Sequence, residues 1–515
     1  MKFEKNQGKV TLLAIGFLFL FIAFNSADNL AAKIMKEDGF DNMGFYSMSL
    51  LYLAFAFGSF FSTAIVNKIG VKFSLFIGGL CYFFRIFCFL FPAYYNENKE
   101  YREQYLYLKT GFIDSMILVS AMINGLGSGI LWTSQGKYVS SCATDENKGF
   151  FFSYFFFIFM ISQILGNLIA AFVIRANGQP TYYIIMSSLS FFGSLVFLFL
   201  TQPSEESKVS KILKDSEIIV DNKKLDSIVE KQELNQNLIN TLERQTLGIV
   251  EIADLQKDPY KPKKDQVKVR GKFKQDLIDV FQMLVSKKMR KIIPLIIWSA
   301  LSLATFAGSF VTMMTATMKE YDWSENEQLE MSLLAMIPLG LGEMSGSVII
   351  GKIMDKYGQK IAIITCSIKL SISILLILAY IAYFKYSVLT FFVTFFWGFQ
   401  DSNLNNILNC ILGFEFESNT VPFSVYSLVQ AIFVFIFMIV QSLILTRTDY
   451  FIYFSVCYAY GIVSLFILYT FDFKKKKNDQ EKIQLSEDQG LLEEETKEGV
   501  KILNEDLIEN KILNY

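Results

Sequence analysis

Long apolar blocks alternate with short polar connections along most of the chain. About twelve of these blocks, each about twenty residues or longer, could cross a hydrocarbon core of about 30 Å as helices that rise about 1.5 Å per residue. Because they lack regular polar alternation, they predict membrane-spanning helices and not the strands of a barrel. We place these spans at 10–32, 44–66, 73–94, 113–136, 149–174 and 181–201, and at 292–317, 329–350, 361–384, 387–412, 421–446 and 449–472.

A short basic turn occurs once in each half of the chain. Residues 67–72 (NKIGVK) align with residues 355–360 (DKYGQK), with Lys, Gly and Lys in register, and each turn follows the second of six spans. Such a repeat is typical of membrane proteins built from two related helical bundles. We therefore expect an all-α membrane protein with twelve transmembrane helices in two six-helix pseudo-symmetric bundles.

The division of the chain follows from where the apolar blocks stop. We expect an N-terminal six-helix bundle at 1–201, a cytosolic linker at 202–290, a C-terminal six-helix bundle at 291–473 and a cytosolic acidic tail at 474–515. Within the linker, apolar residues recur at helical spacing near 272–288 among lysines. This pattern predicts an amphipathic helix, either lying on an anionic inner leaflet or forming an ordinary solvated linker helix.

Composition narrows the class of function. The chain has 515 residues, 52% of them hydrophobic, and a net charge of -1, so nothing points to nucleic acid. Histidine is absent, which excludes histidine-based catalysis and histidine metal sites. No nucleophile and base occur at a recognisable spacing, so we expect no enzyme, no metal and no cofactor. Five of the six cysteines fall within predicted spans and Cys142 falls in a short connection between two spans, so no outer disulfide is implied.

The distribution of lysine predicts the orientation. Lysines precede the first span, fill the turns at 67–72 and 352–360, and begin the tail at 474–477, whereas the connection 320–327 is acidic. Positive charge is kept on the cytoplasmic face of membrane proteins. We expect an integral membrane protein with both termini cytoplasmic, which requires an even number of spans.

Ionisable residues inside predicted spans are costly, roughly 2.5 to 3.5 kcal/mol each at mid-membrane, unless they are paired or hydrated. In the first half Arg85 lies at the depth of Asp28 and Asp114, and we expect it to pair with one of these carboxylates. In the second half we expect Lys369 to pair with Glu343 or Asp401.

Uncharged polar residues also recur at helical spacing on several spans. Two interpretations fit them: the lining of a solvated cavity for an ion or substrate, or hydrogen bonds that join helices. The cavity candidates are Asn25, Asp28, Asn29, Asn124, Ser128, Gln135, Asp401, Asn405 and Asn409, and the seventh span adds Ser302, Thr305, Ser309 and Thr312.

The chain resembles the major facilitator superfamily through its two six-span halves, its long linker and the pattern at 351–360 (GKIMDKYGQK). Within that superfamily it is similar to the uncoordinated-ninety-three family, named for a potassium-channel regulatory protein. The second resemblance rests on residues 16–29 (GFLFLFIAFNSADN), 44–82, 125–136 (GLGSGILWTSQG) and 397–401 (WGFQD). It implies that the first, fourth, seventh and tenth spans line a central cavity.

The resemblance also implies that the basic turn latches neighbouring helices in one conformation. The residues concerned are Lys68, Gly70 and Lys72 in the first half and Gly351, Asp355, Lys356, Gly358 and Lys360 in the second. The first copy departs from the pattern, with Thr63 in place of glycine and Asn67 in place of aspartate, so the latch fits the second half better. The alternative is that these lysines only set topology and cap helix ends.

The tail carries the pattern EDQGLL at 487–492, in which Glu487, Leu491 and Leu492 fit an acidic dileucine sorting signal. The alternative is a plain acidic tail. A sorting signal would favour routing to an endosomal or lysosomal membrane. We therefore expect the protein in the plasma membrane or in an endolysosomal membrane.

Two functions from different classes fit the sequence. The family resemblance favours a regulator or escort of a membrane-protein partner, such as an ion channel or receptor, within the lipid bilayer. The alternative is a secondary transporter of a small solute or ion that works by alternating access between its two halves, with Asp28 or Asp401 as the ion or proton carrier.

Overall fold

The computed structural model describes residues 4–37, 39–40, 43–203, 266–319, 321–441, 443–444 and 446–474. Side chains are not described for some helical residues within these ranges, and Asp28 and Asn29 are among them. The chain divides into two units, Met1–Thr201 with Leu277–Tyr515, and Gln202–Asp276. All the spans belong to the first unit. In the described residues the secondary structure is entirely helical.

The first half contains six spans, as the apolar pattern predicts. Gly178, with φ +80°, and Pro180 break α6 into its fifth and sixth spans, at Lys148–Ile174 and Ala176–Phe199. The short α4 continues the span begun by α3. The helices are α1 (Gln7–Glu37), α2 (Met43–Ile69), α3 (Val71–Cys88), α4 (Leu90–Glu97), η1 (Lys99–Tyr101), η2 (Leu106–Leu108), α5 (Thr110–Cys142), α6 (Lys148–Val196) and η3 (Phe197–Phe199).

The second half repeats this order after the linker helix α9 (Gln266–Val285). Its seventh span is interrupted by the π-helical turn η4, and α13 leads into α14 across a short break with Pro338 in the first turn. The elements are α10 (Lys287–Arg290), α11 (Ile293–Ala304), η4 (Thr305–Ser309), α12 (Phe310–Thr317), α13 (Glu325–Ala335), α14 (Ile337–Tyr357), α15 (Gln359–Tyr383), α16 (Val388–Phe414), α17 (Val421–Gln441) and α18 (Arg447–Tyr469).

Eleven segments of the described chain are long and apolar enough to cross a membrane. The remaining predicted span, α16, falls short only in composition, because it carries Gln400, Asp401 and a run of asparagines. Its 27 residues reach about 40 Å at about 1.5 Å per residue, and it packs between α14 and α15. The prediction of an all-helical membrane fold is therefore confirmed: eleven spans meet both criteria, and α16 occupies the place of the tenth predicted span.

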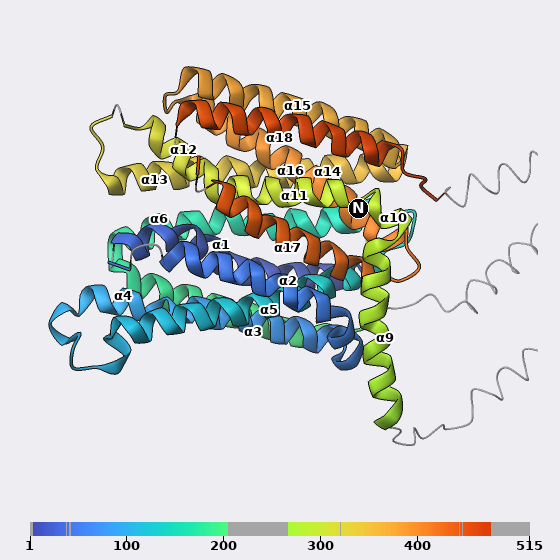
Figure 1. Ribbon diagram of the computed structural model, residues 1–515, viewed down its shortest axis with the longest axis horizontal. Coiled ribbons are helices and arrows are strands. Elements are labelled where there is room, and N and C mark those ends of the chain that lie inside the picture. Colours follow the sequence, from blue (N-terminus) through green and yellow to red (C-terminus); the bar gives the residue numbers. More distant parts are fainter. Residues whose placement is uncertain are drawn as a thin grey trace, which may run out of the picture. The chain divides into compact units, whose positions relative to one another are not determined.

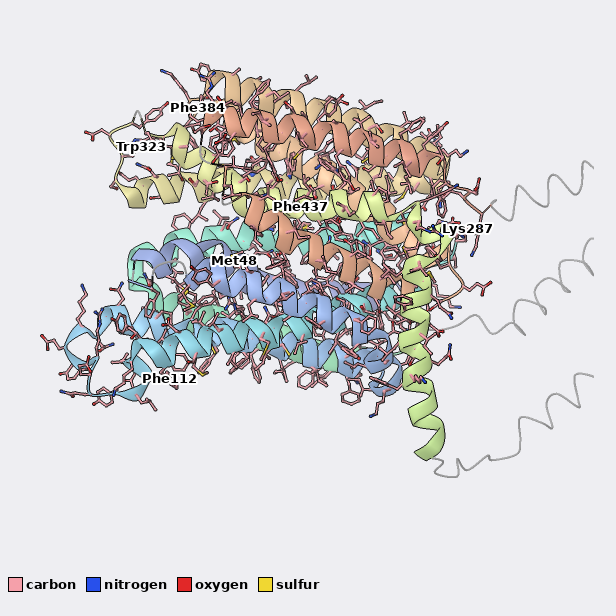
Figure 2. All side chains as sticks on the ribbon, viewed as in Figure 1. Met48, Phe112, Lys287, Trp323, Phe384 and Phe437 are labelled. Carbon is pink, nitrogen blue, oxygen red and sulfur yellow. The ribbon has the colours of Figure 1, made fainter. Side chains whose placement is uncertain are left out.

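The two halves meet chiefly through two pairs of helices. The second span of the first half, α2, packs on the eleventh, α17, and the fifth span, in α6, packs on the eighth, α14 (Figure 1). Within the halves, α1 packs on α6, and α14 packs on α16. Side chains fill the spaces between these helices, with Met48 of α2 labelled among those that face the second half in Figure 2.

The linker helix α9 covers most of the segment in which an amphipathic helix is expected. Val280 is fully buried, and Met283 and Leu284 pack against the core, whereas Phe281 is 59% exposed. Some apolar residues of this helix therefore pack against the bundle, and others are exposed on an open surface. Whether the open surface lies on a leaflet stays a prediction.

Candidate functional site

A central cavity of about 170 Å³ lies between the two halves. Its described lining comes from α1, α2, α3, α5 and α6 on one side and from α11, η4, α14, α16 and α17 on the other. Because both bundles supply walls, any relative movement of the bundles changes access to this cavity.

The wall from the second half centres on Asp401 of α16, which is 3% exposed. Ser302 Oγ donates to its Oδ1 at 2.5 Å, and Asn405 Nδ2 donates to its Oδ2 at 2.7 Å. Ser299 Oγ donates in turn to Asn405 Oδ1 at 3.2 Å, and Gln430 Nε2 donates to Ser299 Oγ at 2.8 Å. The carboxylate thus sits in a hydrogen-bonded network that joins α11, α16 and α17.

Glu343 of α14 lines the same cavity and is 1% exposed. Its Oε2 has no hydrogen-bond partner among the described residues. Gly398 of α16 lies directly beside it, where an added Cβ would stand 3.1 Å from Glu343 Cγ. A close approach of the two helices therefore holds a second carboxyl group in the wall that already contains Asp401.

The wall from the first half contains a cluster of aromatic rings beside the polar Asn25, Ser128, Gln135 and Gln163. Phe21 packs edge-on against Trp132 and Phe159, with ring centroids 5.4 and 5.0 Å apart, and Phe24 packs edge-on against Tyr82 at 4.7 Å. All five rings line the cavity. The only hydroxyl group among these five rings is that of Tyr82 on α3. It accepts hydrogen bonds from Ser128 and Trp132 of α5, which hold it in the cavity wall.

Most of the predicted cavity residues that the structure describes do lie on this surface. Two of the predicted side chains, Asp28 and Asn29, lie outside the described residues, and Asn124 is buried away from the cavity. Those on the cavity wall are Asn25, Ser128, Gln135, Asp401, Asn405 and Asn409. Their role in binding stays a prediction.

The seventh span contributes different residues from those expected. Ser302 bonds to Asp401 behind the cavity surface, and Thr305 bonds to Tyr453 of α18 at 2.9 Å, so these two join helices. Ser299 and the apolar Leu303, Phe306 and Ala307 supply the lining instead. The π-helical turn at η4 shifts the helical phase, which spacing in the sequence does not reveal.

The ion pair expected for Lys369 is not formed. Lys369 Nζ donates to Asn403 Oδ1 at 3.2 Å and lies 4.0 Å from the centroid of the Phe399 ring. Within the described chain, no ion pair joins it to Glu343 or Asp401, which face the cavity. An amide oxygen and a ring face therefore replace the carboxylate that we expected.

Arg85 is fully buried on α3, and three of its contacts are with neutral groups. Its guanidinium donates to Ile117 O at 3.1 Å and to Ser47 Oγ at 2.9 Å, and it lies 4.6 Å from the Phe89 ring. Among the ion pairs of the described residues, none joins Arg85 and Asp114. The other expected partner, Asp28, has a side chain outside the described residues.

The two basic turns have the same backbone conformation. Gly70 and Gly358 adopt φ +82° and +84°, values that favour glycine, and each donates its N–H to the carbonyl four residues earlier. Lys68, Lys72, Lys356 and Lys360 are exposed beside them. We call the end of the bundles that carries Gly70 and Gly358 the turn side.

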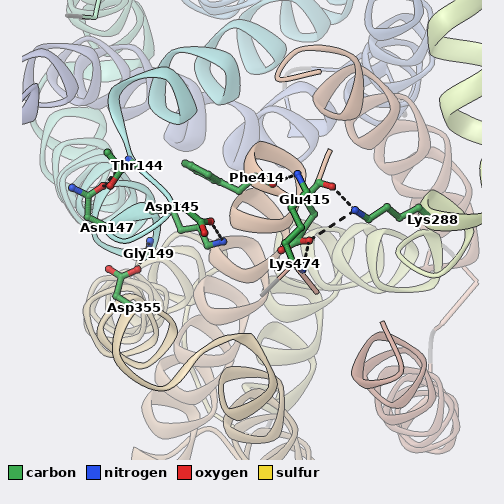
Figure 3. A network of polar contacts seen from close by, with 10 residues as sticks. Thr144, Asp145, Asn147, Gly149, Lys288, Asp355, Phe414, Glu415 and Lys474 are labelled. Atoms are coloured by element: carbon green, nitrogen blue, oxygen red, sulfur yellow. Dashed lines mark hydrogen bonds and ion pairs between the residues drawn. The ribbon is translucent and has the colours of Figure 1, made fainter. Parts of the chain in front are cut away.

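On the turn side the carboxylate of Asp355 joins the halves. Gly149 N and Phe150 N, at the start of α6, donate to Asp355 Oδ1 and Oδ2 at 2.8 and 2.7 Å. Figure 3 shows Gly149 beside the Asp355 carboxylate. Gly351, one turn earlier on α14, lies against Ser153 and the carbonyl of Gly149. The carboxylate therefore caps the first turn of a helix from the other half.

The first copy of the turn makes a different contact. Thr63, which replaces the glycine, shares a 2.5 Å hydrogen bond with Ser424 of α17, and Ser62 contacts the same hydroxyl at 2.7 Å. Asn67 accepts a hydrogen bond from Lys137 within its own half. The two halves are thus joined on the turn side by hydroxyl groups at α2–α17 and by a carboxylate at α6–α14.

A second group of contacts closes the same side around Glu415, which is 2% exposed. Lys288 of α10 lies 3.9 Å from its carboxylate, and Lys474 N donates to Oε2 at 3.0 Å (Figure 3). Glu487, Leu491 and Leu492, the predicted sorting signal, lie outside the described residues.

The sequence profile of the Major Facilitator Superfamily matches residues 105–438, well over half of the chain. The chain belongs to this superfamily. Its curated relatives are UNC93-like proteins, which confirms the resemblance to the uncoordinated-ninety-three family.

Among these relatives, UNC93-like protein MFSD11 of Xenopus tropicalis is 25% identical over 221 residues, 40% of this chain and 45% of that protein. Protein unc-93 homolog A of Bos taurus is 25% identical over 33% of this chain and 35% of that protein. The putative potassium channel regulatory protein unc-93 of Caenorhabditis elegans is 25% identical over 33% of this chain and 22% of that protein. The aligned part thus spans less than half of each relative.

Among solved structures, the proton:xylose symporter XylE bound to 6-bromo-6-deoxy-D-glucose superposes with a TM-score of 0.60. The match covers 90% of this chain and 95% of that chain at 13% identity. It therefore supports the fold across both halves and says nothing of substrate.

Proposed function

We propose that this protein is a secondary transporter that moves a small solute or ion by alternating access. The observation that carries the proposal is the central cavity, which both halves wall and which contains Asp401 and Glu343 in buried positions. Buried carboxyl groups inside a membrane bundle are expensive and are typical of ion, proton or substrate pathways.

The contacts on the turn side support the cycle. We propose that residues 1–201 and 291–473 rock about the cavity, and that opening the turn side breaks the bonds from Gly149 and Phe150 to Asp355. With both termini cytoplasmic, the turn side faces the cytosol and is closed in this conformation. The resident membrane is the plasma membrane or an endolysosomal membrane.

Uptake into proteoliposomes tests the proposal. Purified full-length protein is reconstituted and offered radiolabelled amines, amino acids, sugars and inorganic cations, each with and without a proton gradient. The proposal expects saturable uptake of at least one class, lost on Asp401→Asn. The matched control is Asp114→Asn, because Asp114 lies on α5 and is not among the cavity-lining residues. Equal uptake by the wild type and Asp401→Asn would contradict the role of this carboxylate.

A second candidate function is regulation or escort of a membrane partner such as a potassium channel. The observation that favours it is the similarity to the Caenorhabditis elegans protein named as a putative potassium channel regulator. Co-expression with potassium channels in oocytes tests it. A regulator changes the current amplitude or surface density of one channel, and it does so equally well as Asp401→Asn, because regulation does not require the cavity carboxylate.

A further inference from the structure

Both halves supply aromatic rings and neutral polar groups to the described lining of the central cavity, but its two acidic side chains come from the second half. The first half presents ring faces and edges from Phe21, Phe24, Tyr82, Trp132 and Phe159. The second half presents Asp401 and Glu343. An aromatic ring carries negative charge on its faces, so both walls favour positive charge, one through its quadrupoles and one through its carboxylates.

No basic side chain offsets these carboxylates within the described lining. Lys369 of the same bundle donates to Asn403, lies over the Phe399 ring and is not part of the cavity surface. The fields of Asp401 and Glu343 are therefore available to a ligand, and the site disfavours anions.

Glu343 provides an independent indication of a missing partner. It is 1% exposed, and its Oε2 lacks a hydrogen-bond partner in the described chain. Asp401, in contrast, already accepts from Ser302 and Asn405. A buried acceptor without a donor is costly, and a ligand N–H or cationic group in the cavity would remove that cost.

We infer that the central cavity binds an organic cation with an apolar body, with its charge towards Glu343 and Asp401 and its body on the aromatic wall. The inference rests on the proposed transport function and names its substrate class. A bare metal ion fits less well, because the described residues contain no group of three or more acidic, cysteine or histidine side chains placed to hold one, and aromatic rings supply no hard oxygen ligands.

Binding to full-length protein in lipid nanodiscs, measured by isothermal titration calorimetry, tests the inference. The probes are choline, its uncharged isostere 3,3-dimethylbutan-1-ol, phenyltrimethylammonium and benzenesulfonate. We expect both cations to bind, phenyltrimethylammonium more tightly than choline, and the uncharged isostere at least tenfold more weakly than choline. Binding of the isostere as tight as that of choline, binding of benzenesulfonate alone, or no binding of either cation would overturn the inference.

Variants locate the site. Glu343→Gln and Asp401→Asn keep the side-chain shape and should each weaken phenyltrimethylammonium at least tenfold, whereas the control Asp114→Asn should not. Trp132→Leu should weaken the same probe, and Trp132→Phe should restore most of the loss. Cation binding that is unchanged in both carboxyl variants would overturn the inference.

The two proposals fail separately. Cation binding without uptake into proteoliposomes would leave the inference standing and contradict transport. Uptake of a sugar or an anion, with no binding of either cation, would support transport and overturn the cation inference.

Discussion

Asp355, near the end of α14, accepts a hydrogen bond from the backbone N–H of Gly149, the second residue of α6, over 2.8 Å. The two residues belong to different halves and are 206 positions apart in the chain. With the bond from Phe150, this contact satisfies N–H groups that a helix start leaves without partners, and it places a negative charge at the positive end of the helix dipole. It is the clearest contact that must break if the turn side opens.

Removing this carboxylate should favour an open turn side. Hydrogen bonds to charged groups contribute about 1.5–3 kcal/mol, so Asp355→Ala should shift the equilibrium between closed and open states by about tenfold or more. The readout is the labelling rate of Ser153→Cys by a membrane-impermeant thiol reagent, since Ser153 is 5% exposed in the closed state. The control is Lys356→Gln, an exposed neighbour in the turn. Equal labelling rates with and without Asp355→Ala would contradict the closing role.

Gly351 should tolerate no side chain. A Cβ at this position would stand 2.7 Å from Gly149 O and would overlap Ser153, so Gly351→Val must push α14 away from α6. Overpacking of this kind costs about 1–3 kcal/mol. The apparent melting temperature in detergent should fall for Gly351→Val. It should stay nearly unchanged for Gly111→Ala, because nothing lies within 4 Å of a Cβ at Gly111. Similar melting temperatures for the two variants would show that the α6–α14 contact is loose.

The two buried cations should respond differently to methionine. Lys369 makes one side-chain hydrogen bond and a ring contact, so Lys369→Met removes little and also removes a charge that is costly to bury. Arg85 donates to two groups, and Arg85→Met leaves Ile117 O and Ser47 Oγ without this donor. We expect Arg85→Met to destabilise by about 2 kcal/mol more, measured by thermal unfolding in one detergent. Greater destabilisation by Lys369→Met would contradict this account and support the ion pair with Glu343 or Asp401 that the sequence led us to expect.

The helices and the repeat could be predicted because both depend on local pattern. Apolar length alone indicated the spans, and the matching residues of the two turns indicated the repeat. In the structure Gly70 and Gly358 share one backbone conformation. The spacing of Asp401, Asn405 and Asn409 predicted one polar face, and all three line the cavity. The helix α16 can carry so many polar residues because they do not face lipid: Gln400 and Asn403 are fully buried inside the bundle.

The aromatic wall could not be predicted, because phenylalanine occurs at nearly every position from 150 to 159 and no periodicity marks which rings face inward. In the structure Phe156 and Phe159 line the cavity, while Phe151 and Phe152 are buried in packing. The partner of Lys369 was missed for a related reason. Depth along a span gives the height of a side chain and not its rotation about the helix axis.

The distance between the two halves on the turn side is the most direct test of alternating access. Spin labels at Lys68→Cys and Lys356→Cys occupy exposed positions, one in each turn, and double electron–electron resonance gives their separation. We predict a short distance in the full-length protein, and a second, longer distance whose population grows with Asp355→Ala. A single distance that Asp355→Ala leaves unchanged would contradict rocking of the halves about the cavity.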